Sequence, residues 1–169
     1  KYLRSIFPHF QWNRWYTIAD PGGPIEMAKE TMGTVKSATN PPTREQLLTE
    51  VEASLKTGHR AFKIKVGRGF KWMQRDAGFR RDVEVVRAIR KLVGKDVKLM
   101  VDANNGFDLD GTLRWLDEVG ETNLYFIEEM FPEVVEQDLD LKAYLKKKGW
   151  KTLVADGESA KQVGHFDAF

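Results

Sequence analysis

The 169-residue sequence contains no cysteine. This absence excludes disulfides, thiolate metal sites and cysteine nucleophiles, and it favours a reducing, cytoplasmic location. The sequence also lacks an apolar run of transmembrane length and a signal peptide with a basic start followed by an apolar core. These absences argue against a membrane partner.

A large charge excess is absent too. The 27 basic and 25 acidic residues leave a formal net charge of +2, which gives no case for nucleic acid as a partner. The composition, 41% hydrophobic and 31% charged, is that of a soluble globular protein. At this length one domain with a substantial core is expected, rather than two.

From about residue 36 onward, the sequence repeats one pattern of a helix followed by a strand. A helical stretch ends at a glycine, and an apolar strand with polar or charged residues at its end follows. The first helix opens with a capping box, Thr43 and Gln46, and the others end at Gly94, Gly120 and Gly149. The fourth helix is expected at about 139–148. The pattern predicts four clear strands, near residues 61–66, 97–105, 124–130 and 151–159. A weaker first strand is predicted near residues 34–39.

Strands that alternate with helices predict a parallel α/β sheet, either open and doubly wound or closed as a (β/α)8 barrel. Five strands suffice for the open sheet and are three short of the barrel. No glycine-rich phosphate loop supports the open sheet, because residues 66–70 contain only two glycines and are expected to form a turn. Residues 1–33 do not follow the pattern: they are rich in aromatics and are predicted to form an arm or the remnant of a capping region, before a barrel domain at 34–169.

The strand AFKIKV, residues 61–66, carries Lys63 and Lys65 on one face and apolar side chains on the other. The lysine face must meet water, a carboxylate or a ligand, because an isolated buried ammonium is costly. A solvated edge strand protected by lysines is the simpler interpretation when this strand is considered alone.

Acidic residues fall at the ends of the three strands that follow. These residues are Asp102, with Asn104 on the same face, then Glu128 and Glu129, then Asp156 and Glu158. In parallel α/β folds the carboxyl ends of strands are where ligands bind, so acids from several strands converge on one small volume. Converging carboxylates repel one another, and a divalent cation such as Mg²⁺ resolves the repulsion. The spacing therefore predicts a metal site opposite the two lysines.

The motifs KIKVG, VDANNGF, FIEEM and ADGES, in this order on consecutive strands, resemble the enolase superfamily, and within it the mandelate racemase and muconate-lactonizing group. The resemblance covers roughly residues 36–169. It implies a barrel enzyme that uses Mg²⁺ to stabilise the enolate formed when the proton next to a substrate carboxylate is removed. The implied activity is that of an acid-sugar dehydratase (a lyase) or a racemase or epimerase (an isomerase), acting on a hydroxy acid or acid sugar.

The resemblance also implies roles for single residues. The metal ligands would be Asp102, Glu128 and Glu158, with Asp156 as an alternative to Glu158. Lys65 would be the catalytic base, and Lys63 would help to depress its pKa and bind the substrate carboxylate. Asn104 would lie beside the metal and the substrate. Enzymes of this family are often oligomers, so a homo-oligomer is expected.

The sequence departs from the family in three respects. Met130 stands where the family usually has proline, most of the N-terminal capping domain is absent, and only about five of eight barrel strands are visible. His9, His59 and His165 do not match the second acid/base group of the racemase-like branch and are expected to be surface or packing residues. Two alternatives therefore stand beside the enzyme: a non-catalytic truncated barrel or structural homologue, and an unrelated barrel enzyme in which a strand lysine forms a Schiff base.

Overall fold

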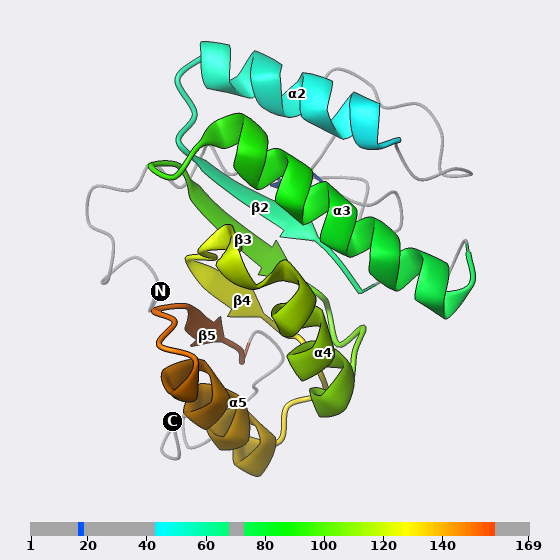
Figure 1. Cartoon of the computed structure of the whole chain (residues 1–169), viewed down its shortest axis with the longest axis vertical. Coiled ribbons are helices and arrows are strands. Elements are labelled where there is room, and N and C mark those ends of the chain that lie inside the picture. Colours follow the sequence, from blue (N-terminus) through cyan, green and yellow to red (C-terminus); the bar gives the residue numbers. More distant parts are fainter. Residues whose placement is uncertain (1–16, 19–42, 68–72, 158–169) are drawn as a thin grey trace.

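In the computed structural model, which describes residues 17–18, 43–67 and 73–157, five strands form one parallel sheet (Figure 1). The strands follow one another across the sheet in sequence order, without a crossover to a distant neighbour. An open doubly wound sheet reverses its strand order at a switch point, whereas a barrel does not. The order therefore favours the barrel. The strands are β1 (Thr17–Ile18), β2 (Ala61–Lys65), β3 (Lys98–Asp102), β4 (Phe126–Glu128) and β5 (Leu153–Ala155).

Among the described residues, four α-helices accompany these strands and lie as a layer along the sheet, each beside the next (Figure 1). Right-handed crossovers between adjacent parallel strands place successive helices on the same face. The helices are α2 (Arg44–Lys56), α3 (Arg75–Val93), α4 (Leu109–Val119) and α5 (Val135–Lys147), and the short 3-10 helix η3 (Gly120–Thr122) follows α4.

The predicted helix ends are confirmed in most cases. Thr43 and Gln46 form the expected capping box of α2, in which each side chain accepts a hydrogen bond from the other's backbone N–H. The helix α3 ends at Gly94, and α4 begins after Asp108, whose side chain accepts a hydrogen bond from the backbone of Gly111. The helix α5 begins at Val135, earlier than the predicted start near residue 139.

The strands are shorter than the apolar pattern predicted, because the backbone turns away from extended geometry at their carboxyl ends. Asn104 and Asn105 follow β3 with φ of 43° and 60°, and Glu129 follows β4 with φ of 44°. Gly157, after β5, has φ of 100°. These left-handed residues cannot continue a strand. The polar residues at the strand ends therefore belong to tight loops.

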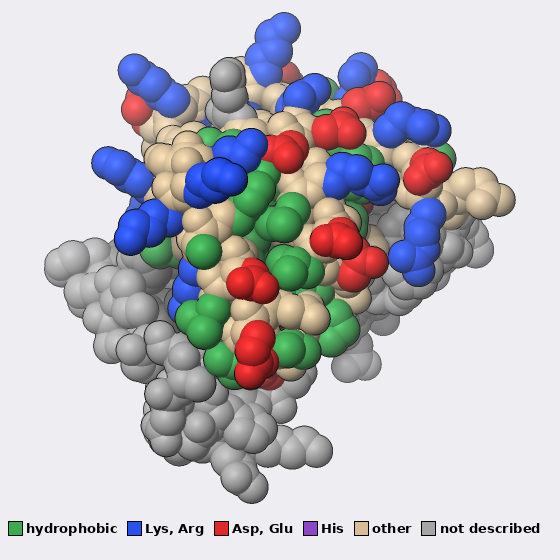
Figure 2. Space-filling model, turned by 60° about the horizontal axis from the view of Figure 1, so that its bottom comes forward, with side chains coloured by type: hydrophobic (Ala, Val, Ile, Leu, Met, Phe, Trp, Pro, Cys, Tyr) green, Lys and Arg blue, Asp and Glu red, His purple; other side chains and the backbone are tan. Residues whose placement is uncertain are grey.

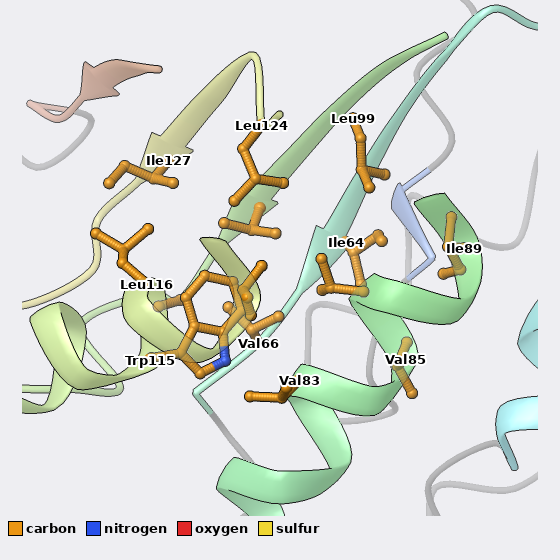
Figure 3. Close-up of a cluster of buried hydrophobic side chains, with 14 of the residues drawn as sticks. Ile64, Val66, Val83, Val85, Ile89, Leu99, Trp115, Leu116, Leu124 and Ile127 are labelled. Carbon is orange, nitrogen blue, oxygen red and sulfur yellow. The ribbon is translucent and has the colours of Figure 1, made fainter. Parts of the chain in front are cut away.

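The sheet buries its hydrophobic side chains against the helices (Figure 3). Phe62 and Ile64 alternate with the two lysines of β2 and are almost completely buried. Figure 3 shows Ile127 of the sheet close to Leu116 of α4, and Ile64 on the side of the cluster that α3 covers. Burying a side chain of this size stabilises the fold by about 1.5 to 3 kcal/mol. The apolar face predicted from AFKIKV is thus the core face.

The predicted first strand, residues 34–39, lies outside the described residues. The strand β1 instead comes from the region predicted to be an arm, and it pairs in parallel with β2 through Thr17 opposite Lys63 and Ile18 opposite Ile64. A two-residue strand is too short to have a recognisable period. Its pairing covers an edge of β2, and the domain boundary at residue 33 stays a prediction.

Basic and acidic side chains are interspersed on the face shown in Figure 2. That face therefore carries no extended field of one sign, as the nearly balanced composition predicts. Among the residues that the structure describes, no helix combines the length and the hydropathy needed to span a membrane.

Candidate active site

Three charged residues form a row across the carboxyl ends of β2, β3 and β4. Lys65 is paired with Asp102, and Asp102 is paired with Glu128, in the parallel register. Directly paired residues lie on the same face of the sheet, which here is the face opposite the helices. The structure therefore brings together three of the residues that the sequence predicted to share a site.

Asp102 is the centre of this row. Its side chain is 1% exposed, and its Oδ2 atom lies 2.5 Å from Lys65 Nζ and 3.1 Å from Lys63 Nζ. Its other oxygen, Oδ1, accepts a hydrogen bond of 3.1 Å from the backbone N–H of Asn104. A buried carboxylate is stable only when it is paired and hydrogen-bonded, and Asp102 meets both conditions.

Lys63 links Asp102 to Glu128, whose Oε2 atom is 2.8 Å from Lys63 Nζ. Burial acts to lower the pKa of Lys63, but the carboxylates of Glu128 and Asp102 outweigh it and hold that pKa above its usual value. Burial, with a smaller contribution from Asp102, raises the pKa of Glu128 above its usual value, although the Lys63 ammonium opposes the change. Lys63 is therefore a charged group at neutral pH.

Asn104 extends the site on the other side of Lys65. Its Oδ1 atom accepts a hydrogen bond of 2.7 Å from Lys65 Nζ, and its Nδ2 atom donates one of 3.0 Å to Glu129 Oε2. The sequence predicted that Asn104 lies beside the site. It did not predict a role for Glu129, which is 4% exposed.

The loops that carry Asn104 and Glu129 are held together by their backbones. The N–H of Asn105 donates to the carbonyl of Glu129 at 2.7 Å, and the N–H of Glu129 donates to that of Ala155 at 3.0 Å. Met130, in the position where the family usually has proline, is buried, and its carbonyl accepts from the N–H of Phe107. Left-handed non-glycine residues are strained and persist only where such contacts hold them, as at functional sites.

A second close approach holds β2 and β3 in place behind the lysines. A Cβ atom on Gly106 would lie 2.3 Å from the carbonyl oxygen of Gly67, so the two loops touch backbone to backbone. The N–H of Gly67 also donates to the buried carboxylate of Asp82 at 2.8 Å. The sequence analysis did not predict a role for Asp82. The feature that could have indicated one is an acidic residue next to Val83, on the apolar side of the predicted helix.

The third predicted metal ligand, Glu158, lies outside the described residues. Asp156, its alternative, accepts a hydrogen bond from the backbone N–H of Gly157. Across the described residues, no three His, Cys, Asp or Glu side chains come together in a way that could hold a metal ion. Asp102 and Glu128 are thus the two predicted ligands that the structure places next to each other.

Of the three histidines, only His59 lies among the described residues. Its Nδ1 atom is 2.9 Å from Thr57 Oγ1 and 3.0 Å from the carbonyl of Ser54. These contacts stabilise the loop between α2 and β2, which lies just before the amino end of β2. This position agrees with a packing role.

The sequence matches the enolase C-terminal domain-like family over residues 46–169. Among curated proteins it is 30% identical to an N-succinyl-L-Arg/Lys racemase of Bacillus cereus, over 66% of this chain and 27% of the racemase. It is 31% identical to an arabinonate dehydratase of Saccharolobus solfataricus, over 62% of this chain and 25% of the dehydratase.

Solved structures agree with the sequence matches. A galacturonate dehydratase from Geobacillus sp., complexed with D-galacturonate and 5-keto-4-deoxy-D-galacturonate, has a TM-score of 0.68 and 37% identity, over 72% of this chain and 33% of that one. A mandelate racemase/muconate lactonizing protein from Geobacillus sp. Y412MC10, complexed with magnesium and tartrate, has a TM-score of 0.69 and 36% identity, over 74% of this chain and 32% of that one.

These comparisons concern a part of each relative. The chain spans about a quarter of the length of the curated relatives and about a third of the solved chains. The parallel sheet with its single layer of helices corresponds to part of the barrel in these proteins. Both the family match and the fold lead to one conclusion: the chain belongs to the enolase superfamily, with relatives in its mandelate racemase and muconate-lactonizing group.

Proposed function

We propose that the protein is a Mg²⁺-dependent enzyme that removes the proton next to a substrate carboxylate to give a stabilised enolate. Lys65 is the base, and Asp102, Glu128 and Glu158 hold the metal. The observation that carries the proposal is the row of Lys65, Asp102 and Glu128 on adjacent strand ends. This row brings an amine and two carboxylates within the reach of one small substrate.

The donor set fits Mg²⁺. This hard cation takes oxygen ligands, commonly from one to three carboxylates with water or substrate in the remaining positions. Asp102 and Glu128 supply carboxylate oxygens from neighbouring strands, and both contact the Lys63 ammonium, so this small volume already favours a cation. Mg²⁺ bound there would supply positive charge that stabilises the negative charge developing on the substrate carboxylate.

The two lysines have different roles in the proposed mechanism. Lys65 Nζ, held between Asp102 and Asn104, is the group that takes the proton from the substrate carbon. Lys63 shares the same Asp102 oxygen atom and stays charged, so its charge attracts the substrate carboxylate.

The relatives support the proposed substrate class. Their names specify an acid-sugar dehydratase, a racemase and, in other cases, cycloisomerases and an epimerase. All of these reactions are consistent with loss of a proton next to a carbonyl group. We therefore propose an acid-sugar dehydratase or a racemase or epimerase that acts on a hydroxy acid or acid sugar, in a homo-oligomer.

The metal is tested first by calorimetric titration of the full protein with MgCl₂. We expect binding in the wild type and in Asp96→Asn, which changes an exposed acid, and loss of binding in Asp102→Asn. Equal binding in Asp102→Asn would refute the metal assignment. Loss of activity on chelation would reject the Schiff-base alternative, because that chemistry needs no metal.

The base is tested by exchange of the substrate proton in heavy water, followed by proton NMR. Arabinonate, galacturonate and tartrate form the first panel, since related proteins are named for or complexed with them. Lys65→Ala should slow the exchange at least about 100-fold, the usual contribution of a general base. The exposed Lys91→Ala is the control. Undiminished exchange in Lys65→Ala would refute the base assignment, and exchange absent from a Mg²⁺-binding wild type would favour the non-catalytic homologue.

A further inference from the structure

Glu129 is an unusual residue for its place in the fold. It follows β4 directly, its backbone is left-handed with φ of 44°, and its side chain is 4% exposed. A glutamate is costly both to bury and to hold in this conformation. Neither cost is explained by the metal site, because Glu128 is the carboxylate in the row with Asp102.

The hydrogen bonds of Glu129 connect it to Lys65 through Asn104. Glu129 Oε2 accepts from Asn104 Nδ2 at 3.0 Å, and Asn104 Oδ1 accepts from Lys65 Nζ at 2.7 Å. The three residues come from the ends of β2, β3 and β4. They form a continuous chain of polar contacts across the face on which the lysines lie.

The direction of these bonds is imposed by chemistry. An ammonium group only donates hydrogen bonds, so the Asn104 amide must present its oxygen to Lys65. Its NH₂ group then faces the other way and needs an acceptor. The Glu129 carboxylate supplies an acceptor oxygen to this NH₂ group.

We propose that Glu129 is a positioning residue: its buried carboxylate fixes the orientation of the Asn104 amide, and the amide oxygen holds Lys65 Nζ in place. Its effect on catalysis rests on the proposed role of Lys65 as the base. The backbone supports this role, because the N–H and the carbonyl of Glu129 are bonded to Ala155 and Asn105. The carboxylate is thus anchored to β5 and to the loop after β3 at the same time.

Two substitutions of similar size separate orientation from packing. Glu129→Met keeps the length of the side chain and removes the acceptor. Glu129→Gln keeps an acceptor oxygen and the shape, and it should restore the amide orientation. The exposed Glu136→Gln is the control for the loss of one negative charge.

The first measurement is independent of activity. The side-chain NH₂ resonances of Asn104, identified by their loss in Asn104→Asp, are followed by NMR in the full protein, and their exchange with water is timed. Exchange in Glu129→Met should be at least about fivefold faster than in the wild type, the factor expected for one lost hydrogen bond. Exchange in Glu129→Gln should stay close to the wild-type rate.

The second measurement uses any substrate of the panel that exchanges its proton. A base displaced by about 1 Å loses about 100-fold in rate, so Glu129→Met should lower kcat by about this factor with little change in KM. Glu129→Gln should recover most of kcat, which a general loss of stability would not predict.

The two measurements also separate this inference from the proposed function. Unchanged Asn104 exchange in Glu129→Met, or equally fast exchange in Glu129→Gln, overturns the positioning role whatever the enzyme does. If Lys65→Ala retains the exchange activity while the Asn104 amide responds as expected, the assignment of the base is wrong and the positioning of the amide by Glu129 stands.

Discussion

Asp138, in the first turns of α5, should make the protein less stable at neutral pH than at mildly acidic pH. The residue is 1% exposed, and its Oδ2 atom has no hydrogen-bond partner. Burial raises its pKa from 3.8 to about 6, with further contributions from the charges of Asp156 and Glu133, and only Lys142 opposes the change. The folded protein therefore favours the protonated carboxyl group.

The sign and size of the effect follow from proton linkage. Below pH 3.8 the carboxyl group is protonated in both the folded and unfolded states, so it contributes no penalty. As pH rises through 3.8 toward 6, only the unfolded state ionises, and the folded state becomes relatively less stable. Above pH 6 the full penalty applies, about 3 kcal/mol, because each pKa unit corresponds to about 1.4 kcal/mol.

Asp138→Asn removes the charge and should remove this penalty. We expect the variant to exceed the wild type in free energy of unfolding by about 3 kcal/mol at pH 7.5 and by about half of that at pH 5, measured by urea denaturation. The exposed Asp140→Asn in the same helix is the control. A variant no more stable than the wild type at pH 7.5, or an advantage that does not change with pH, would refute this account.

Two further predictions concern the scaffold behind the site. The Arg90 guanidinium donates hydrogen bonds to the backbone carbonyls of Thr122, Gly94, Val97 and Asn123. Arg90→Lys should lower the free energy of unfolding by about 2 kcal/mol, because an ammonium group cannot reproduce these bonds. The exposed Arg80→Lys in the same helix is the control and should have no effect. Gly106→Ala should destabilise by about 3 kcal/mol in chemical denaturation, because its Cβ would overlap the backbone of Gly67; an unchanged denaturation midpoint would show that these loops separate easily.

The sequence alone was sufficient for the alternation of helices and strands, since this depends on local signals. Glycines at helix ends, the capping box at Thr43 and the alternation of apolar and lysine residues in β2 each act over a few residues. The face shared by Lys63 and Lys65 follows from the strand period, and the position of Asp102 beside Glu128 follows from parallel pairing. The match to the enolase C-terminal domain-like family agrees with these motifs.

The contacts that hold the site together could not be predicted in this way, because they join loops that are distant in sequence. Asn104 meets Glu129 only because β3 and β4 are adjacent, and Glu129 takes a left-handed conformation that its side chain does not favour. In the sequence, Asp82 and Asp138 cannot be told apart from ordinary surface acids, but in the structure their neighbours bury them. The sequence thus determined which elements form and which residues face the site. Tertiary packing decided how far each strand extends, which acids lose contact with water and which partner each polar side chain meets, since these depend on distances between separate segments.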